Sequence, residues 1–333
     1  MLFRSNGIDL QEAATNTTAA ACMEFGFGLF RASATDGCQY NTIKNCVITM
    51  STVSQTTGTG SFMNGAHGIV AVNQRDSSGN AVTVTPTAFS GTNSYNSIYS
   101  NTVQKCNSGI VFSGYADLSS PSTLTDVGND IGGSSSTTGN SVLNFGGGGT
   151  GNPAVGIYMG SQSSVNCRFN TVNNNNGSGK DHATTIRGIL WTGSAVTSGG
   201  TCSDNRVTVG IRAISSQCSG IEFSAGANNS QTVNINNNIV VTKRDTASAT
   251  GTNYGIYTTT GAPGTLSVSG NRLGMRANNA SGTQYLFSNT CAPSTTLSVT
   301  NNRIDSVNMY AATVSSVIYY MYSTGGSATL AIN

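Results

Sequence analysis

A short polar stretch near the middle of the chain is the densest group of residues that could do chemistry. Asp181 and His182 are consecutive, and Asp204 and Arg206 follow about one sequence repeat later. A carboxylate and an imidazole can transfer protons, and an arginine can pair with an acidic sugar. Such a group would suit a polysaccharide lyase or a glycoside hydrolase working in a groove beside the 174–186 loop. The alternative is an ordinary solvated loop, because the 13 acidic residues are scattered along the chain.

A weaker metal hypothesis concerns Asp126 and Asp130, which flank Asn129. Carboxylate and amide oxygens suit calcium, but this spacing matches no strong calcium-binding loop. The eight cysteines contain no Cys-x-x-Cys pair, which disfavours a structural zinc site. We therefore expect no cofactor, with calcium as the weak exception.

A repeated phrase positions these residues. In nearly every copy an apolar residue is followed by Asn three residues later and by a second apolar residue five later. The Asn positions are Asn41, Asn101, Asn170, Asn205, Asn238, Asn271 and Asn302. From Asn170 onward they recur at intervals of 35, 33, 33 and 31 residues. A period of this size indicates a repeat architecture.

A second phrase alternates with the first and begins with Gly followed by Ile, as at Gly109, Gly156 and Gly188. Each repeat holds two or three short runs of period 2, bounded by Gly, Ser, Asn or Thr, which predicts strands. The expected fold is all-β: a right-handed parallel β-helix of eight or nine coils, about 40 Å long. The repeated Asn is expected in the left-handed region at one turn, stacked into a ladder.

The repeat predicts one continuous domain over 1–333. Residues 1–37 should form the beginning of the solenoid and its first coil, and 38–155 irregular coils with long loops. Residues 156–333 should form regular coils of 31–35 residues. Loops at 174–186, 242–252 and 274–284 are expected on one side of the rod.

The cysteines follow the same repeat. Cys38, Cys167 and Cys202 each precede a repeated Asn by three residues, which places them in one inward-facing column. Cys167 and Cys202 fall in adjacent coils, so their Cα atoms should lie about 4.8 Å apart, within disulfide range. A disulfide and a pair of buried free thiols both remain open.

The alternation of Asn-x-Ile/Val turns with Gly-Ile strands resembles the right-handed parallel β-helix superfamily of pectate-lyase-like solenoids. The phrases at 17–30, 128–133 and 144–150 also resemble long secreted Asn/Thr/Ser-rich β-helix proteins of Bacteroidota. That resemblance implies an extracellular or cell-surface location and a C-terminal type IX sorting domain. The chain shows no signal segment and ends inside a copy of the turn phrase, so we expect it to be part of a longer protein.

Composition excludes several classes of protein. Charged residues make up 8% of the chain and the net charge is only +2, with no basic stripe for nucleic acid. No apolar run is long enough for a membrane span.

Arg206, Arg272 and Arg303 each follow a repeated Asn and should form a sparse outward column. Trp191, Tyr158 and Tyr257 lie on strand phrases, where aromatics are more often packed than open to sugars.

Three functions fit this sequence. The leading expectation is an extracellular structural or adhesive module, a stiff rod that presents loops to glycans or other cell-surface components, with end-to-end self-association open. The second is the polysaccharide lyase or hydrolase described above. The third is a glycan-binding or ice-binding surface. Ice binding needs a flat, regular Thr array, and neither Thr258–Thr260 nor Thr295–Thr296 recurs in register, so it ranks last.

Overall fold

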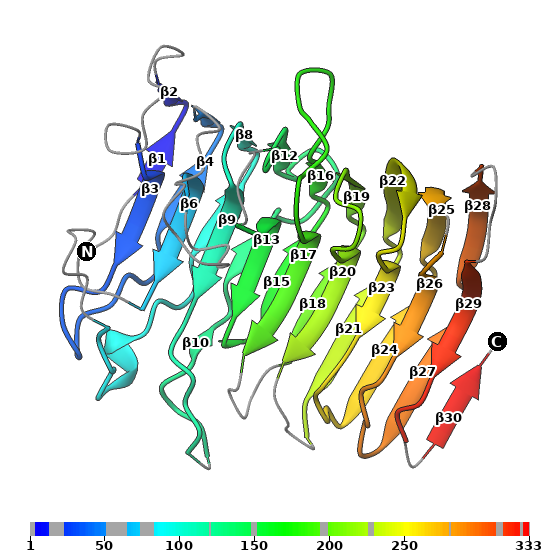
Figure 1. Cartoon of the computed structure of the whole chain (residues 1–333). Helices are drawn as coiled ribbons and strands as arrows, with labels where there is room; N and C mark the ends of the chain where they lie inside the picture. Colours follow the sequence, from blue (N-terminus) through cyan, green and yellow to red (C-terminus); the bar gives the residue numbers. More distant parts are fainter. Residues whose placement is uncertain are drawn as a thin grey trace.

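The computed structural model describes residues 4–12, 23–50, 65–73, 83–119, 121–147, 152–193, 199–225, 230–279, 281–310, 316–326 and 329–332. These residues form an all-β parallel solenoid, which confirms the predicted fold class (Figure 1). Part of the expected first coil, at 1–3 and 13–22, lies outside the described residues.

Three parallel sheets run along the solenoid, and each turn of chain adds one strand to each of them. Sheet A has ten strands: β1 (Arg4–Asn6), β4 (Thr42–Lys44), β7 (Ser97–Tyr99), β11 (Asp130–Ile131), β15 (Val165–Arg168), β18 (Gly200–Ser203), β21 (Thr232–Asn236), β24 (Thr265–Ser269), β27 (Thr296–Thr300) and β30 (Thr329–Ile332). Sheet B has nine: β2 (Asp9–Gln11), β5 (Val47–Thr49), β8 (Thr102–Gln104), β12 (Ser141–Leu143), β16 (Thr171–Asn173), β19 (Arg206–Ile211), β22 (Ile239–Ala249), β25 (Arg272–Asn279) and β28 (Arg303–Met309).

Sheet C also has nine strands: β3 (Phe25–Phe30), β6 (His67–Val72), β9 (Ser108–Ser113), β13 (Ala154–Gly160), β17 (Ile186–Gly193), β20 (Cys218–Ala225), β23 (Asn253–Thr258), β26 (Thr283–Asn289) and β29 (Val317–Ser323). A two-stranded sheet pairs β10 (Asp126–Val127) with β14 (Gln162–Ser163), and a short 3₁₀ helix, η1, spans Phe89–Gly91.

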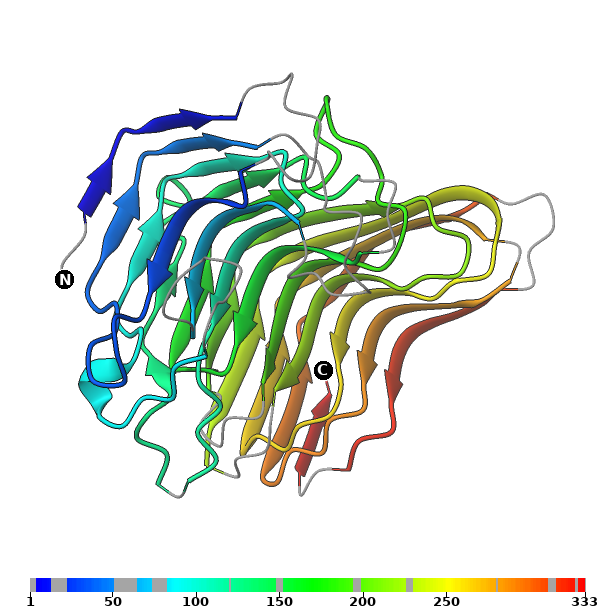
Figure 2. The same ribbon diagram turned by 60° about the vertical axis from the view of Figure 1, so that its left-hand side comes forward.

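Two of the three predicted loops are largely strand. β22 and β25 continue through most of 242–252 and part of 274–284, and they pair in parallel from Ile239–Arg272 to Arg244–Ala277. Figure 2 shows these strands as long arms that leave the stack on one side. The polar Thr, Lys and Arg residues of this stretch predicted a loop. In the structure, backbone hydrogen bonds between neighbouring coils continue through it and keep it as strand.

The Gly-Ile phrase has a steric cause. In sheet C the glycines face the Val residues of sheet B across the core. A Cβ added to Gly188 would lie 2.3 Å from Val207 Cγ1 and 2.5 Å from the carbonyl oxygen of Gly220. The same clash with a Val of sheet B recurs at Gly68, Gly109, Gly156 and Gly220. The glycine column therefore sets how closely the two sheets approach, and the Ile that follows each glycine fills the core.

The Asn ladder is present as a column of buried side chains. Asn170 donates from its backbone N and its Nδ2 to Asn205 Oδ1, at 2.9 and 3.0 Å. Asn205 repeats both bonds to Asn238 Oδ1, at 3.0 Å each, and its Nδ2 also reaches the carbonyl of Cys167 at 2.9 Å. The pattern continues through Asn271 to Asn302. Each amide thus satisfies backbone groups that the sharp turn removes from the sheets.

Four details of the prediction are wrong. The column runs from Asn101 through Asn140, which was not predicted, to Asn302, so it spans about six turns rather than the eight or nine predicted coils. Asn41 belongs to a second column with Asn96 and Asn129. Cys38 lies beside this second column and is therefore not in the column of Cys167. The register partners of Cys167 are Ile131 and Cys202.

The left-handed residue is not the ladder Asn but the one before it. Ser100, Phe169, Asp204, Asn237 and Asn301 all have φ between 53° and 60°. Ser, Phe, Asp and Asn all occur at this position, and none of these side chains is buried. The ladder Asn is selected for its amide group rather than for its backbone tolerance.

Cys167 and Cys202 are register partners in adjacent coils, both fully or almost fully buried, and both are free thiols in this structure. The partner thiol and burial raise the pKa of Cys167 well above its usual value. Of the two arrangements left open by the sequence, the structure contains the pair of buried thiols.

We expect Gly188→Ala to destabilise the protein by about 1–3 kcal/mol, because the added methyl overpacks the contact with Val207. Thermal unfolding followed by circular dichroism would measure this. Gly326→Ala is the matched control, since no heavy atom lies within 4 Å of a Cβ built there. Equal melting temperatures for the two variants would contradict the steric argument.

Asn205→Ala should lower the free energy of unfolding by roughly 2–4 kcal/mol, because it leaves buried donors of Asn170 without an acceptor. Urea denaturation provides the measurement. Asn308→Ala, at an exposed position of β28, is the control and should change stability by less than about 0.5 kcal/mol. A loss no larger than that of the control would remove the ladder from the stabilising interactions.

Candidate functional site

The structure does not bring the four predicted catalytic candidates together. Asp181 lies against the C-terminal part of β19, where a Cβ on Gly210 would meet its Oδ1 at 2.1 Å. Asp204 occupies the turn before β19, six residues from Gly210, and Arg206 is the exposed first residue of that strand. At about 3.3 Å per residue, Asp181 and Asp204 are separated by roughly 20 Å.

His182 is a structural residue. Its side chain is buried, with Nε2 2.9 Å from the carbonyl oxygen of Asn152, and Nδ1 accepts a hydrogen bond from the backbone N of Gly147 at 3.1 Å. Burial lowers the pKa of His182 to about 4. The neutral imidazole therefore joins the loop after β12 to the 174–186 loop, and it does not face an open groove.

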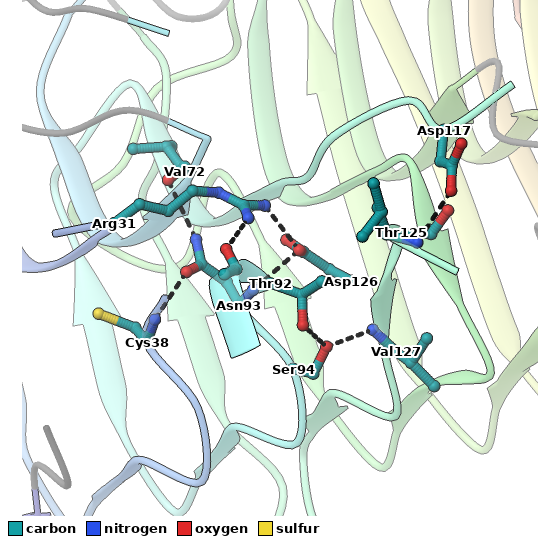
Figure 3. Close-up of polar contacts among 12 residues, drawn as sticks. Arg31, Cys38, Val72, Thr92, Asn93, Ser94, Asp117, Thr125, Asp126 and Val127 are labelled. Carbon is teal, nitrogen blue, oxygen red and sulfur yellow. Dashed lines mark hydrogen bonds and ion pairs between the residues drawn. The ribbon is translucent and has the colours of Figure 1, made fainter. Parts of the chain in front are cut away.

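The two aspartates of the calcium hypothesis are both paired with arginine. Arg31 and Asp126 form an ion pair at 2.7 Å with both side chains buried, and Asp126 Oδ1 also accepts from the backbone N of Asn93 at 2.8 Å (Figure 3). Asp130 lies 3.5 Å from Arg168. No cluster of three or more His, Cys, Asp or Glu with metal-binding geometry occurs in the part of the chain that the structure describes.

The network around Arg31 fastens the irregular first half of the solenoid. Asn93 Oδ1 accepts from the backbone N of Cys38 at 2.9 Å, and its Nδ2 donates to the carbonyl oxygen of Val72 at 3.0 Å (Figure 3). Arg31 also donates to the carbonyl oxygen of Gly91. Desolvation raises the pKa of Asp126, and the charge of Arg31 opposes this. The carboxylate takes the place that an Asn occupies in the other columns, so its role is structural.

The predicted arginine column is interrupted and partly neutralised. Arg206 and Arg272 are separated in register by Ile239. Arg272 and Arg303 share one carboxylate, Asp305, at 2.8 and 2.6 Å. These groups are exposed, and such pairs contribute little to stability.

The strongest candidate surface lies on the outward side of sheet C and was not predicted as a unit. It consists of five tyrosines, here called the tyrosine face: Tyr254, Tyr257, Tyr285, Tyr319 and Tyr322. Tyr254, Tyr285 and Tyr319 are register partners in β23, β26 and β29. Their rings stack with centroids 5.0 and 5.1 Å apart and planes within 9°.

Tyr257 and Tyr322 widen this stack. Tyr257 stacks on Tyr254 with ring centroids 4.2 Å apart, and the Tyr322 ring is tilted by 58° against Tyr285 at 5.3 Å. Burial, with the neighbouring phenols second, raises the pKa of Tyr254 to about 12, so it stays protonated at neutral pH. Stacked rings cover one another's faces, and the surface therefore presents ring edges and hydroxyl groups.

An ion pair borders the tyrosine face. Arg187 Nε lies 2.8 Å from Glu222 Oε2, and Gln217 donates to the same oxygen at 2.7 Å. Glu222 is the register partner of Tyr257, and Arg187 lies two strands before Tyr254 in the same row. Glu222 and Arg187 are the only acid and the only arginine in the nine strands of sheet C.

Trp191, unlike these tyrosines, is buried in the core against Phe223.

Sequence reasoning named Tyr257 but missed the other four tyrosines of this face. The signal was available, because Tyr254, Tyr285 and Tyr319 hold the same place relative to the core residues of their coils. Recognising it requires the register of β26 and β29, which lack the Gly-Ile phrase.

Comparisons with known proteins add no relative. The sequence matches no protein-family model, and comparisons with curated proteins and with solved structures return no match. Among the described residues, no helix is long and apolar enough to cross a membrane. The assignment therefore rests on the structure itself: a parallel β-solenoid with a tyrosine-rich outer face.

His182 gives the protein a defined response to acid. Its pKa is about 4 in the folded state and near 6.5 in the unfolded state. The unfolded state therefore binds the proton more readily, and the stability contributed by neutral His182 falls as the pH drops from about 6.5 to 4. The loss reaches roughly 3 kcal/mol.

Urea denaturation at a series of pH values would show this, with His182→Gln compared with the parent. The variant should have a flatter dependence on pH between about 4 and 6.5, since it has no imidazole to protonate. Lys180→Ala, an exposed change in the same loop, should keep the parent's slope. Identical slopes for all three proteins would show that His182 does not titrate with unfolding.

Proposed function

We propose that this chain is an extracellular structural and adhesive module, a stiff rod whose tyrosine face and loops contact glycans or other cell-surface components. The observation that carries the proposal is the outward side of sheet C. Five ordered tyrosines lie there in adjacent coils, beside a single neutralised ion pair. Tyrosine provides contact area at a low cost in conformational entropy, which is why it is enriched at binding surfaces.

Three features favour contact over catalysis. A glycoside hydrolase uses two carboxyl groups about 5–9.5 Å apart, and the strands of sheet C contain only Glu222. That carboxylate is held by Arg187 and Gln217. The predicted alternative beside the 174–186 loop has its acids on opposite ends of β19. A hydrolase or lyase is therefore the less favoured function.

The rod supplies the mechanical part of the proposal. Continuous parallel ladders and the stacked Asn amides resist bending and shear along the whole solenoid, and repeated weak contacts on one side add avidity. An extracellular location and a relationship to secreted proteins of Bacteroidota belong to this proposal and rest on the resemblance of the repeat phrases. End-to-end association of rods is a further part of it.

A polysaccharide panel tests the proposal. The purified chain should be retained on at least one insoluble or immobilised glycan, with or without calcium, and should release no new chain ends. Tyr285→Ser with Tyr319→Ser should weaken retention at least about tenfold, because truncating an aromatic residue that anchors an interface costs more than about 1 kcal/mol. Tyr40→Ser with Tyr95→Ser, which removes another stacked and exposed pair in the first coils of the solenoid, is the matched control.

New reducing or unsaturated ends would overturn the non-catalytic part of the proposal. Retention that is equally weakened by the control pair would show that the tyrosine face is not the contact surface.

A further inference from the structure

A second ordered surface lies on sheet A and has a different composition from the tyrosine face. In β21, β24 and β27 the residues alternate strictly, with apolar side chains buried and small polar side chains outward. We call this outward surface, which ends at Thr329 of β30, the hydroxyl face. In Figure 1 these strands lie side by side at the C-terminal half of the rod.

Threonine recurs in register along this face. Thr232 pairs with Thr265, Thr265 with Thr296, and Thr296 with Thr329. This row runs across four consecutive coils. This register corrects the expectation from the sequence that Thr296 does not recur in neighbouring coils. The array is visible only after each coil is aligned on its ladder Asn, because the coils differ in length.

Two further rows run beside the threonine row. Ser267 pairs with Asn234 and with Ser298, two residues along each strand. A third row joins Ser269 to Thr300. Rows are therefore spaced by about 6.6 Å along the strands and their members by about 4.8 Å along the rod, which makes a two-dimensional lattice.

The lattice is regular and rigid. Register across β21, β24 and β27 is continuous over five residues with no shift, whereas the β22–β25 and β25–β28 pairings of sheet B both shift. The apolar residues between the rows are locked in the core: Leu266 and Val268 are at most 1% exposed. Threonine adds a χ1 restricted by its branched Cβ, so hydroxyl and methyl groups hold fixed directions.

The hydroxyl face also differs from the rest of sheet A in charge. The strands β18, β21, β24, β27 and β30 contain no Asp, Glu, Lys, Arg or aromatic residue. The earlier strands of the same sheet carry Lys44, Tyr99, Asp130 and Arg168. An uncharged array of hydroxyl and methyl groups therefore occupies the C-terminal half of sheet A. A shorter uncharged row, Thr102, Ser141 and Thr171, crosses three strands of sheet B.

We propose that the hydroxyl face binds ice. Its methyl and hydroxyl groups would order a layer of water molecules in the regular rows given above, and a growing ice crystal extends an ordered layer of this kind. A hydrogen bond made through an ordered water molecule is nearly as favourable in enthalpy as a direct one. Water that is already ordered on the protein loses little further entropy when it joins the crystal.

A crystalline polysaccharide is the main competing ligand, and the composition disfavours it. Sugar rings are usually held by aromatic side chains and by planar amide or charged groups. This face has no aromatic residue, and its large amides are limited to Asn234 and Asn236 of β21. The surface suited to sugars is the tyrosine face, on a different sheet.

Slow growth of an ice hemisphere from a dilute solution of the purified chain tests the proposal. The parent should be enriched in the ice, while an inert protein of similar size remains in the liquid. Thr265→Lys places a long charged side chain at the centre of the array and should reduce enrichment at least about tenfold, the effect of roughly 1.4 kcal/mol in binding. Thr208→Lys, an equivalent change on the outer side of sheet B, should leave enrichment unchanged.

Thr296→Lys is a second disruption, and far-ultraviolet circular dichroism confirms the fold of each variant. No enrichment of the parent over the inert protein would overturn the proposal, and so would equal enrichment of Thr265→Lys and Thr208→Lys. Binding to crystalline cellulose or chitin that Thr265→Lys abolishes, without ice binding, would assign the face to polysaccharide instead. Glycan retention through the tyrosine face is independent of all these outcomes.

Discussion

The parallel register between successive coils is the constraint on which the rest of this structure depends. Once each coil lies directly over the previous one, every position in the repeat becomes a column, and each column must be filled by residues that tolerate contact with copies of themselves. Ile stacks well on Ile in the core, and Asn can donate and accept at once. A charged residue repeated in a column would repel its neighbours. The 8% charge content of the chain follows from this geometry.

Two columns carry most of the constraint. The Asn amides satisfy backbone groups at the buried turn, where no strand is available to do so. The glycines of sheet C allow the Val residues of sheet B to approach within contact distance. Where a coil departs from these columns the structure compensates locally, as Arg31, Asp126 and Asn93 do in the first half of the solenoid. Such a buried ion pair requires desolvation of both charges, so it is a less economical solution than an amide.

The fold class could be predicted from the sequence because the repeated apolar and Asn positions are the ones that are buried in each coil. Asn205, Asn238, Asn271 and Asn302 were found by spacing alone, since the last coils are similar in length. Asn140 was missed and Asn41 was assigned to the wrong column, because the coils around them contain extra turns that change the spacing. The candidate sites were harder to predict. Asp181 and Asp204 are close to one repeat apart in sequence, yet they occupy different ends of β19, so a similar spacing did not mean the same column.

The same geometry explains how one chain can carry two unlike surfaces. A strand in a solenoid has one side in the core and one in solvent, and the solvent side is free of the packing constraints that fix the other. The same outward position in successive coils forms one row, so similar residues at that position produce a continuous surface. In sheet C this produces stacked phenol rings, and in sheet A rows of hydroxyl groups. The two rows lie on different sheets and share no residue, so each can specify its own ligand while the core and the Asn column hold both in fixed positions.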